Sequence, residues 1–354
     1  MDLSEFHYDL PEDRIAQQPL EDRAASRMLV VHRKEQRWED RRFREFPSFV
    51  QPGDVIVLNN SKVLPARLFG HRMGARSLAI GRNNAKLHEH LSGKVEVLLV
   101  RAAKEDPLTW QVLARPGRKL RIGERIRFSP RLHAEIVERG DFGERTLRFE
   151  VEGDFFEALN EAGHMPLPPY IHRPDTRNDQ SRYQTVYASS AGSVAAPTAG
   201  LHFTPEILAQ CEQAGASLAQ VTLHVGLGTF QPLHTNVVED VKLHSEFYQV
   251  HPDAARQIRS AQRVIGVGTT SVRTVETLAA KDWQQLEGDT GLFIYPGYRY
   301  HRIDAMLTNF HLPQSSLLLL VCALAGKDLM LAAYRHAVEA KYRFYSYGDC
   351  MLIL

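Results

Sequence analysis

Four short segments of the sequence combine histidine with glycine, threonine, asparagine or glutamate, as catalytic loops often do. They occupy residues 196–204, 223–231, 243–246 and 307–313. Each follows or overlaps the end of an expected strand, and in open α/β sheets ligands bind at the carboxyl ends of the strands. One such histidine is more often a hydrogen-bonded structural residue. Four of them in polar loops favour a shared site.

Histidine and glutamate are the side chains of these segments that suit proton transfer near neutral pH. We expect four residues to transfer protons or to orient substrate, with the glutamate as a base or as the anchor of an amine: His202, His224, Glu246 and His311. The pair His244 and Glu246 resembles the H-x-E of zinc deaminases, but the P-C-x-x-C that completes that metal site is missing. No metal is therefore expected.

The segment 266–273, Gly-Val-Gly-Thr-Thr-Ser-Val-Arg, connects an expected strand to an expected helix. Its glycines allow a ligand to approach the backbone, and the first N–H groups of a helix favour an anion. Thr269 and Thr270 add hydroxyl groups, and Arg273 adds a fixed positive charge. A phosphate or a carboxylate fits this turn. A capped helix packed on a sheet explains the same residues equally well.

Two stretches have the composition of an RNA contact. A basic run at 115–127 includes Arg118 and Lys119, and the segment 341–347, Lys-Tyr-Arg-Phe-Tyr-Ser-Tyr, alternates cations with aromatic rings. Aromatic rings stack on unpaired bases and cations pair with phosphates. A solvated strand face and core aromatics remain the alternatives. The net charge of +1 means that any RNA-binding surface is local.

The composition is that of a globular protein of a reducing compartment. Its 354 residues exceed the usual size of one domain. The three cysteines form no C-x-x-C pair, which argues against a disulfide framework. The first residues are acidic where a signal peptide would be basic, and the apolar run 317–325 is too short to span a bilayer. We expect a cytoplasmic protein without membrane contact.

Strands that alternate with helices predict a layered α/β domain outside residues 67–153. The strands expected there are at 27–32, 55–58, 219–225, 264–268 and 292–295. The expected helices are at 155–162, 205–213 and 270–280, with an apolar helix after residue 316 and an arm with a short helix at 6–19.

Short alternating segments at 95–100, 109–114 and 146–151 are typical of a small β-barrel or sandwich. The predicted fold is therefore α/β: a layered main domain of residues 1–66 and 154–354, interrupted by an inserted β-barrel of residues 67–153.

Taken in order, the motifs resemble those of one family, the S-adenosylmethionine:tRNA ribosyltransferase-isomerases of queuosine biosynthesis. The resemblance extends over nearly the whole chain, through blocks at 6–19, 58–67, 163–171, 183–187, 196–203, 222–232, 243–246, 268–273, 295–297, 308–313 and 341–349. Residues 73–92 depart from the family pattern and look like an insertion in the β-domain.

The resemblance implies an enzyme that transfers and isomerises the ribosyl moiety of S-adenosylmethionine. The acceptor would be 7-aminomethyl-7-deazaguanine at the wobble position of tRNA, and epoxyqueuosine-tRNA, adenine and methionine would be the products. S-adenosylmethionine is then a substrate, the partner is tRNA, and no prosthetic group is needed. We expect a monomer.

On this chemistry, further residues become candidates for binding. Phe203 or Phe230 could face the sulfonium through cation–π attraction. The set expected to bind S-adenosylmethionine is Thr198, Gly200, Phe203, Gly228, Thr229, Phe230, Thr269, Thr270 and Arg273. The set expected to bind the tRNA is Arg118, Lys119, Asn309, Lys341, Arg343, Tyr345 and Asp349.

Two other functions fit parts of the sequence. An RNA-binding module without catalysis would bind tRNA tightly in a salt-sensitive way and release no adenine. A conventional methyltransferase would produce methylated RNA and S-adenosylhomocysteine. The first leaves the histidine and glutamate loops unexplained, and the second lacks its glycine-rich strand-turn with an acidic ribose partner.

Overall fold

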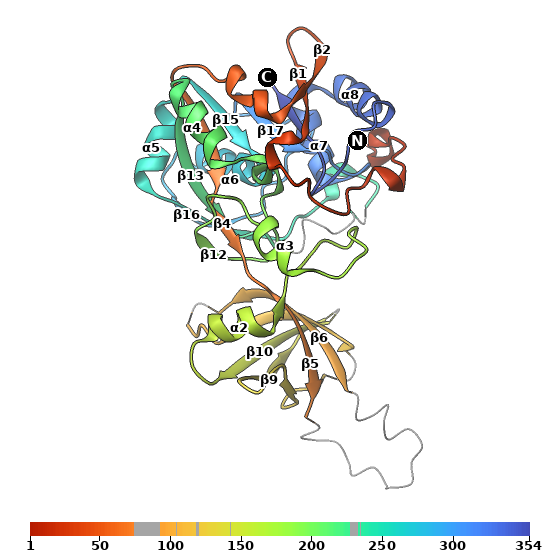
Figure 1. Ribbon diagram of the computed structural model, residues 1–354, viewed down its shortest axis with the longest axis vertical. Helices are drawn as coiled ribbons and strands as arrows, with labels where there is room; N and C mark the ends of the chain where they lie inside the picture. The colour runs from red at the N-terminus through yellow and green to blue at the C-terminus, as the bar shows by residue number, and fades with distance from the viewer. Residues whose placement is uncertain (74–92, 104, 118–119, 142, 227–232, 234) are drawn as a thin grey trace.

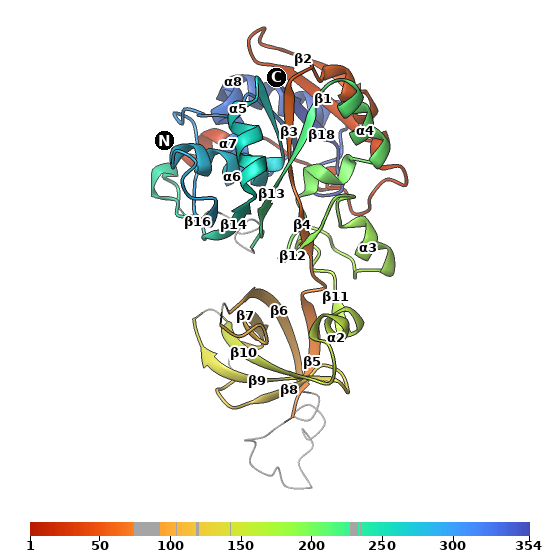
Figure 2. The same cartoon turned by 90° about the vertical axis from the view of Figure 1, so that its left-hand side faces the viewer.

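The strands of the protein form two large sheets, which occupy two lobes stacked along the long axis of the molecule (Figure 1). The structure is a computed structural model and describes residues 1–73, 93–103, 105–117, 120–141, 143–226, 233 and 235–354. The larger lobe holds a nine-stranded sheet, and the smaller lobe a seven-stranded sheet. The chain passes to the smaller lobe after β4 (Ser61–Val63) and returns near β12 (Ser190–Ser193), which pairs with β4 in parallel (Figure 2).

The larger sheet has the order β16-β14-β13-β3-β15-β17-β18-β1-β2. Its strands are β1 (Arg27–His32), β2 (Arg37–Arg42), β3 (Asp54–Asn59), β13 (Ser217–Leu223), β14 (Glu246–Val250), β15 (Arg263–Val267), β16 (Glu287–Thr290), β17 (Ala305–Asn309) and β18 (Cys350–Ile353). The four strands β13, β3, β15 and β17 are parallel, so their carboxyl ends share one edge. β18 is antiparallel to β17, and β1 is parallel to β18, so the amino ends of β18 and β1 lie at that edge too.

Helices cover both faces of this sheet because its central strands are apolar on both sides. Successive residues of a strand point to opposite faces. Val57 and Met306 belong to the core under one helical layer, while Ile56 and Leu307 belong to the core under the other. The first layer is α5 (Pro252–Ser260), α6 (Gly268–Ala280), α7 (Ser316–Ala325) and α8 (Lys327–Glu339), and the second contains α4 (Pro205–Gln213) and the 3-10 helix η4 (Phe43–Phe49).

No single helix of the described chain is long and apolar enough to cross a membrane. By length and composition, α7 and α8 meet that test only as a pair, and the pair is bent by 117°.

The smaller sheet closes into a barrel because β5 pairs with both β6 and β8. Its strands are β5 (Arg67–Arg72), β6 (Lys94–Ala102), β7 (Thr109–Arg115), β8 (Arg125–Arg127), β9 (Leu132–Arg139), β10 (Glu144–Val151) and β11 (Gly163–His164), which adds to β5. Alternating residues such as Val95, Val97 and Leu99 fill the interior. Helix α2 (Phe155–Ala162) packs Phe155 into the same core, at the end of the barrel nearer the larger lobe (Figure 2).

The predicted fold class is confirmed: a layered α/β lobe is interrupted by a β-barrel. Helices α2 and α4 begin and end at the expected residues, and the Thr204 hydroxyl accepts a hydrogen bond from the Ile207 N–H at 3.3 Å, as an N-cap does. The arm contains two 3-10 helices, η1 (Leu3–Phe6) and η2 (Glu12–Arg14).

The strand expected at 264–268 lies one residue earlier, as β15, because Gly268 already begins α6, two residues before the helix start expected at 270. Two other expected strands differ more from the structure. The strand expected at 219–225 begins and ends two residues earlier, as β13. The expectation of a strand at 292–295 was wrong, because these residues form a loop and the edge strand β16 precedes them. The Leu292 carbonyl accepts a hydrogen bond from Arg273 Nε at 3.0 Å, so this backbone group bonds a side chain instead of a neighbouring strand.

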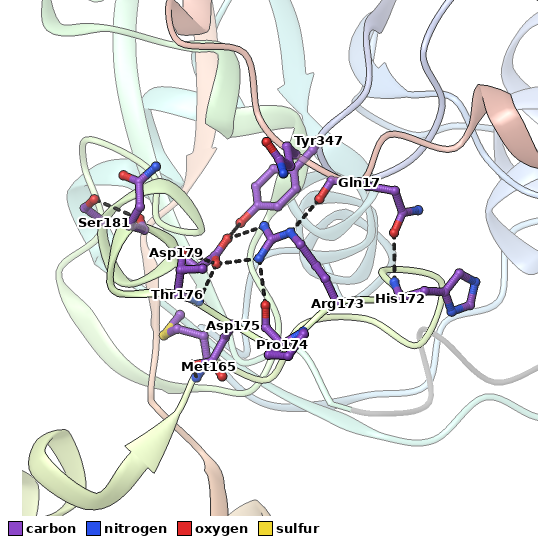
Figure 3. Close-up of polar contacts among 12 residues, drawn as sticks. Gln17, Met165, His172, Arg173, Pro174, Asp175, Thr176, Asp179, Ser181 and Tyr347 are labelled. Carbon is purple, nitrogen blue, oxygen red and sulfur yellow. Dashed lines mark hydrogen bonds and ion pairs between the residues drawn. The ribbon is translucent and has the colours of Figure 1, made fainter.

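A buried carboxylate fixes the chain where it returns from the barrel (Figure 3). Asp179 lies on α3 (Arg177–Arg182). Its carboxylate accepts five hydrogen bonds of 2.8 Å: two from the Nη atoms of Arg173, two from the N–H and the hydroxyl of Thr176, and one from the Tyr347 hydroxyl. Burial alone would raise the pKa of Asp179, but these donors outweigh it and hold that pKa well below its usual range. Arg173 Nε also donates to the Gln17 carbonyl at 2.9 Å, which joins the N-terminal arm to this network.

We expect Asp179→Asn to lower the free energy of unfolding by about 3 kcal/mol, because it removes one partner of a buried ion pair and turns an acceptor into a donor. Urea denaturation followed by circular dichroism measures this. Arg256→Gln is the matched control, since its ion pair with Asp253 is largely exposed (73% and 69%). The control should change stability by less than about 0.5 kcal/mol. An equal effect of the two substitutions would contradict the role of Asp179.

Candidate functional site

A cavity of about 270 Å³ lies where β15 and β17 end in the larger lobe. Its wall is built mainly from residues 195–199, 268–270, 308–317 and 345–346. The first three segments belong to sequence clusters that we expected to form a site. The segments 268–270 and 308–317 meet because they follow the parallel strands β15 and β17, whose carboxyl ends share the edge at which ligands bind in open α/β sheets. The segment 195–199 follows β12, outside this sheet.

Two helix N-termini line this cavity. Helix α6 begins at Gly268, whose φ of +81° is a conformation that side chains other than glycine rarely adopt. Helix α7 begins at Ser316, and the Ser315 hydroxyl caps it by accepting a hydrogen bond from the Leu318 N–H at 3.2 Å. Gly268, Ser315 and Ser316 are all part of the wall. Helix N-termini carry partial positive charge, so this part of the cavity favours an anion.

Three buried polar atoms of the wall have no hydrogen-bond partner among the residues that the structure describes. They are Thr270 Oγ1, Asn309 Oδ1 and the Tyr345 hydroxyl. Their residues are 8%, 3% and 8% exposed. Because buried polar groups are nearly always hydrogen-bonded, these atoms are the positions at which a bound molecule would be held.

Tyr345 has an unusual backbone conformation, with φ at +71°. Such a conformation is uncommon for a bulky residue and is found at functional sites. The ring of Tyr345 packs against Tyr170, with 4.2 Å between centroids, and Tyr170 shares a hydrogen bond of 2.6 Å with Ser346. Burial raises the pKa of Tyr345, so its hydroxyl keeps its proton and can donate.

His311 and His202 are neutral at physiological pH. Burial lowers the pKa of His311 to about 3, and its Nε2 lies 2.8 Å from the Thr308 hydroxyl on the cavity wall. Burial, followed by the positive charges of Arg343 and Arg23, lowers the pKa of His202 to about 3. His202 is not part of the cavity wall, but it lies behind it: its Nε2 is 3.3 Å from Asn309 Nδ2.

Glu246 and Arg273 form a buried ion pair, and neither residue lines this cavity. The second carboxylate oxygen of Glu246 accepts the Gly226 N–H at 2.9 Å. Both residues border a smaller hollow next to α7. The ring of His224 stacks on Phe247, with 6.2 Å between centroids, and burial lowers its pKa.

Several other expected site residues are buried and packed against, or hydrogen-bonded to, other parts of the protein. Phe203 is fully buried against Phe43 and Phe46, and the carboxylate of Asp349 accepts the N–H groups of Arg27 at 2.9 Å and Arg343 at 2.8 Å. Burial raises the pKa of Asp349.

Gly200 is packed so closely on the Tyr187 hydroxyl that a Cβ would lie 2.0 Å from it, and Lys341 is exposed. Five expected residues lie outside the described residues: Arg118, Lys119, Gly228, Thr229 and Phe230. Most of the expected insertion at 73–92 lies outside them as well.

The sequence matches the family described as "Queuosine biosynthesis protein" over residues 3–353. The chain belongs to this family. It is 65% identical to a protein of Solibacter usitatus named S-adenosylmethionine:tRNA ribosyltransferase-isomerase, and the match covers all of both chains. A protein of the same name from Symbiobacterium thermophilum is 48% identical over the full length of both chains.

A solved structure gives the same result. The crystal structure of the S-adenosylmethionine tRNA ribosyltransferase of Thermotoga maritima is 38% identical to this chain, with a TM-score of 0.54. The match covers 99% of this chain and 100% of that one. The family resemblance of the sequence motifs is confirmed.

In this queuosine biosynthesis protein, one cavity brings together six of the twenty site residues expected from the sequence: Thr198, Thr269, Thr270, Asn309, His311 and Tyr345. Sequence reasoning missed the contributions of Thr308, Ser315 and Ser316. A serine pair before an apolar run is the usual signal of a helix N-terminus, and it could have marked the second anion-favouring position. Among the described residues, no group of three or more His, Cys, Asp or Glu side chains could hold a metal ion.

The low pKa of His311 predicts a loss of stability in mild acid. Below the ordinary pKa of 6.5 the unfolded chain takes up a proton on this residue, and the folded chain does not until the pH approaches about 3. The stability advantage of the wild type over His311→Gln should therefore be about 2 kcal/mol smaller at pH 5 than at pH 7.5.

Urea unfolding at the two pH values measures this difference. Phe156→Leu is the control, because it removes no titratable group and the Phe156 side chain is exposed, and its stability difference from the wild type should stay constant. A constant difference for His311→Gln as well would show that burial of His311 does not affect its protonation.

Proposed function

We propose that this chain transfers and isomerises the ribosyl moiety of S-adenosylmethionine onto 7-aminomethyl-7-deazaguanine at the wobble position of tRNA, and that the cavity at the ends of β15 and β17 binds S-adenosylmethionine. Membership of the family supports the reaction. One observation carries the site: two helix N-termini line the same cavity as three buried polar atoms that have no partner among the described residues. The products are epoxyqueuosine-tRNA, adenine and methionine.

The cavity offers different partners to the carboxylate and to the sulfonium of the donor substrate. The N-termini of α6 and α7 suit the methionine carboxylate, because they carry partial positive charge. Thr198, Thr269 and Thr270 add hydroxyl groups beside them. The rings of Tyr345 and Tyr170 suit the sulfonium, since a cation over an aromatic ring gains about 0.5 to 2 kcal/mol. They replace Phe203 in that role, because Phe203 is enclosed by other rings.

The candidate catalytic residues divide into two roles. We assign orientation to His311 and His202, since an imidazole whose pKa is about 3 is a weak base. Glu246 is assigned to holding Gly226 and Arg273, because these two residues engage its two oxygens. His224 is retained for proton transfer, as its Nδ1 has no partner among the described residues.

Contact with tRNA is assigned to the C-terminal segment and the barrel. Lys341 is exposed, whereas Arg343 donates through Nη2 to the Gln18 carbonyl, and its Nη1 is buried without a partner in the described part of the chain. Asp349 would act by holding the backbone of Arg343. Arg118 and Lys119 remain candidates from the sequence.

We propose that the inserted domain, expected at residues 67–153, extends to about residue 164. Strand β11 pairs with β5, and α2 contributes Phe155 and Leu159 to the barrel core, which supports a boundary near His164. We also propose that the protein acts as a monomer in the cytoplasm and uses no prosthetic group. Its three cysteines are free and buried, which fits a reducing compartment.

Chromatographic detection of free adenine tests the reaction. The protein is mixed with S-adenosylmethionine and tRNA that carries 7-aminomethyl-7-deazaguanine, with unmodified tRNA as the control. Adenine and methionine should appear in equal amounts and only with the modified tRNA. S-adenosylhomocysteine would instead indicate a methyltransferase, and binding of both substrates without adenine would indicate an RNA-binding module.

Thr270→Val tests the cavity. It keeps the shape of the side chain and removes a hydroxyl that would bind the substrate, so the KM for S-adenosylmethionine should rise about three- to tenfold, as expected for loss of one hydrogen bond. Thr146→Val in the barrel is the control, because its hydroxyl bonds only Glu138 at 2.9 Å among the contacts described. An unchanged KM for Thr270→Val would remove Thr270 from the binding site.

A further inference from the structure

His202 lies between two partners that determine which of its ring nitrogens carries the proton. The Ser26 hydroxyl donates to the Arg23 carbonyl at 3.3 Å, so its oxygen is left to accept from His202 Nδ1–H at 2.9 Å. In the neutral ring, Nε2 is then an acceptor. It accepts a hydrogen bond from Asn309 Nδ2 at 3.3 Å.

The Asn309 amide is therefore oriented from behind the cavity. Besides His202, its Nδ2 faces the carbonyl oxygens of Tyr345 at 3.2 Å and Asp349 at 3.3 Å. With three acceptors around Nδ2, the amide oxygen must occupy the other position. Asn309 is 3% exposed and lines the cavity, and its Oδ1 has no hydrogen-bond partner among the described residues.

The neutral state of His202 is a condition for this arrangement. A protonated ring would present an N–H to the Nδ2–H of Asn309, and the amide would have to reverse. Burial and the charges of Arg343 and Arg23 both disfavour the protonated ring. Reversal would bring Nδ2 to the cavity in place of Oδ1.

We propose that Asn309 Oδ1 accepts a hydrogen bond from a neutral N–H or O–H group of the bound ribosyl donor, and that His202 is the positioning residue that keeps the Asn309 amide in this orientation. This inference rests on the proposed binding of S-adenosylmethionine in the cavity. Two kinds of donor in that molecule meet the description: the adenine amino group and the ribose hydroxyls. The Asn309 Nδ2 atom is already engaged, so the contact is a single bond to the oxygen.

The alternative role of His202 is packing alone, since its ring lies 5.4 Å from that of Phe43. A pair of substitutions separates the two roles. In His202→Gln the terminal amide reaches the position of Nε2 and can supply the acceptor for Asn309. In His202→Asn the shorter side chain reaches only the position of Nδ1, so it can keep the Ser26 contact but not the Asn309 contact.

Steady-state kinetics with the full-length protein and modified tRNA distinguish these outcomes. We expect His202→Gln to keep kcat/KM for S-adenosylmethionine within about threefold of the wild type, and His202→Asn to lower it at least tenfold, mostly through KM, with unfolding midpoints of the two variants alike. Equal losses in the two variants would show a packing role and overturn the proposal. A wild type that releases no adenine would instead refute the proposed function.

Calorimetric binding identifies the donor group without requiring turnover. The probes are S-adenosylmethionine, its inosine analogue, which carries an oxo group in place of the adenine amine, and its 2′- and 3′-deoxy analogues. Asn309→Ala should weaken S-adenosylmethionine binding about tenfold and should leave unchanged the affinity for the one analogue that lacks the donor. Equal affinity of Asn309→Ala and the wild type for S-adenosylmethionine itself would overturn the proposal.

Discussion

The parallel arrangement of β13, β3, β15 and β17 is the constraint on which the site depends. It brings the residues that follow four strands, far apart in the sequence, to one edge of the sheet. The turn before α6 and the loop before α7 then lie side by side, so two helix N-termini meet at one cavity. The protein therefore has a local position that favours an anion, although its net charge is only +1.

The strands β18 and β1 bring further residues of the site to the same edge. Their amino ends lie there, which brings Ser26 and the segment 345–349 next to the end of β17. The hydrogen bonds from Ser26 through His202 to Asn309 connect these elements. In the proposed site, the residues that touch the substrate are thus oriented by residues that do not.

The inserted barrel interrupts the chain without separating the parts of the site. Asp179 binds the returning segment to Tyr347, and Arg173 binds it to the N-terminal arm (Figure 3). The same returning segment carries Tyr170 to the cavity wall, where it packs on Tyr345. A buried ion pair outside the cavity therefore helps to keep the aromatic wall in place.

The sequence by itself determined the family, through the resemblance of its ordered motifs. It also determined the α/β class with its inserted barrel and segments such as α2 and α4, because periodicity and caps are local signals. It also marked Thr270, Asn309 and His311. Only the tertiary structure decided that Phe203 and Asp349 are enclosed, that Glu246 is engaged by Arg273, and that the 292–295 segment is a loop. These facts depend on partners distant in the chain, and the residue types alone do not specify which partner a buried side chain meets.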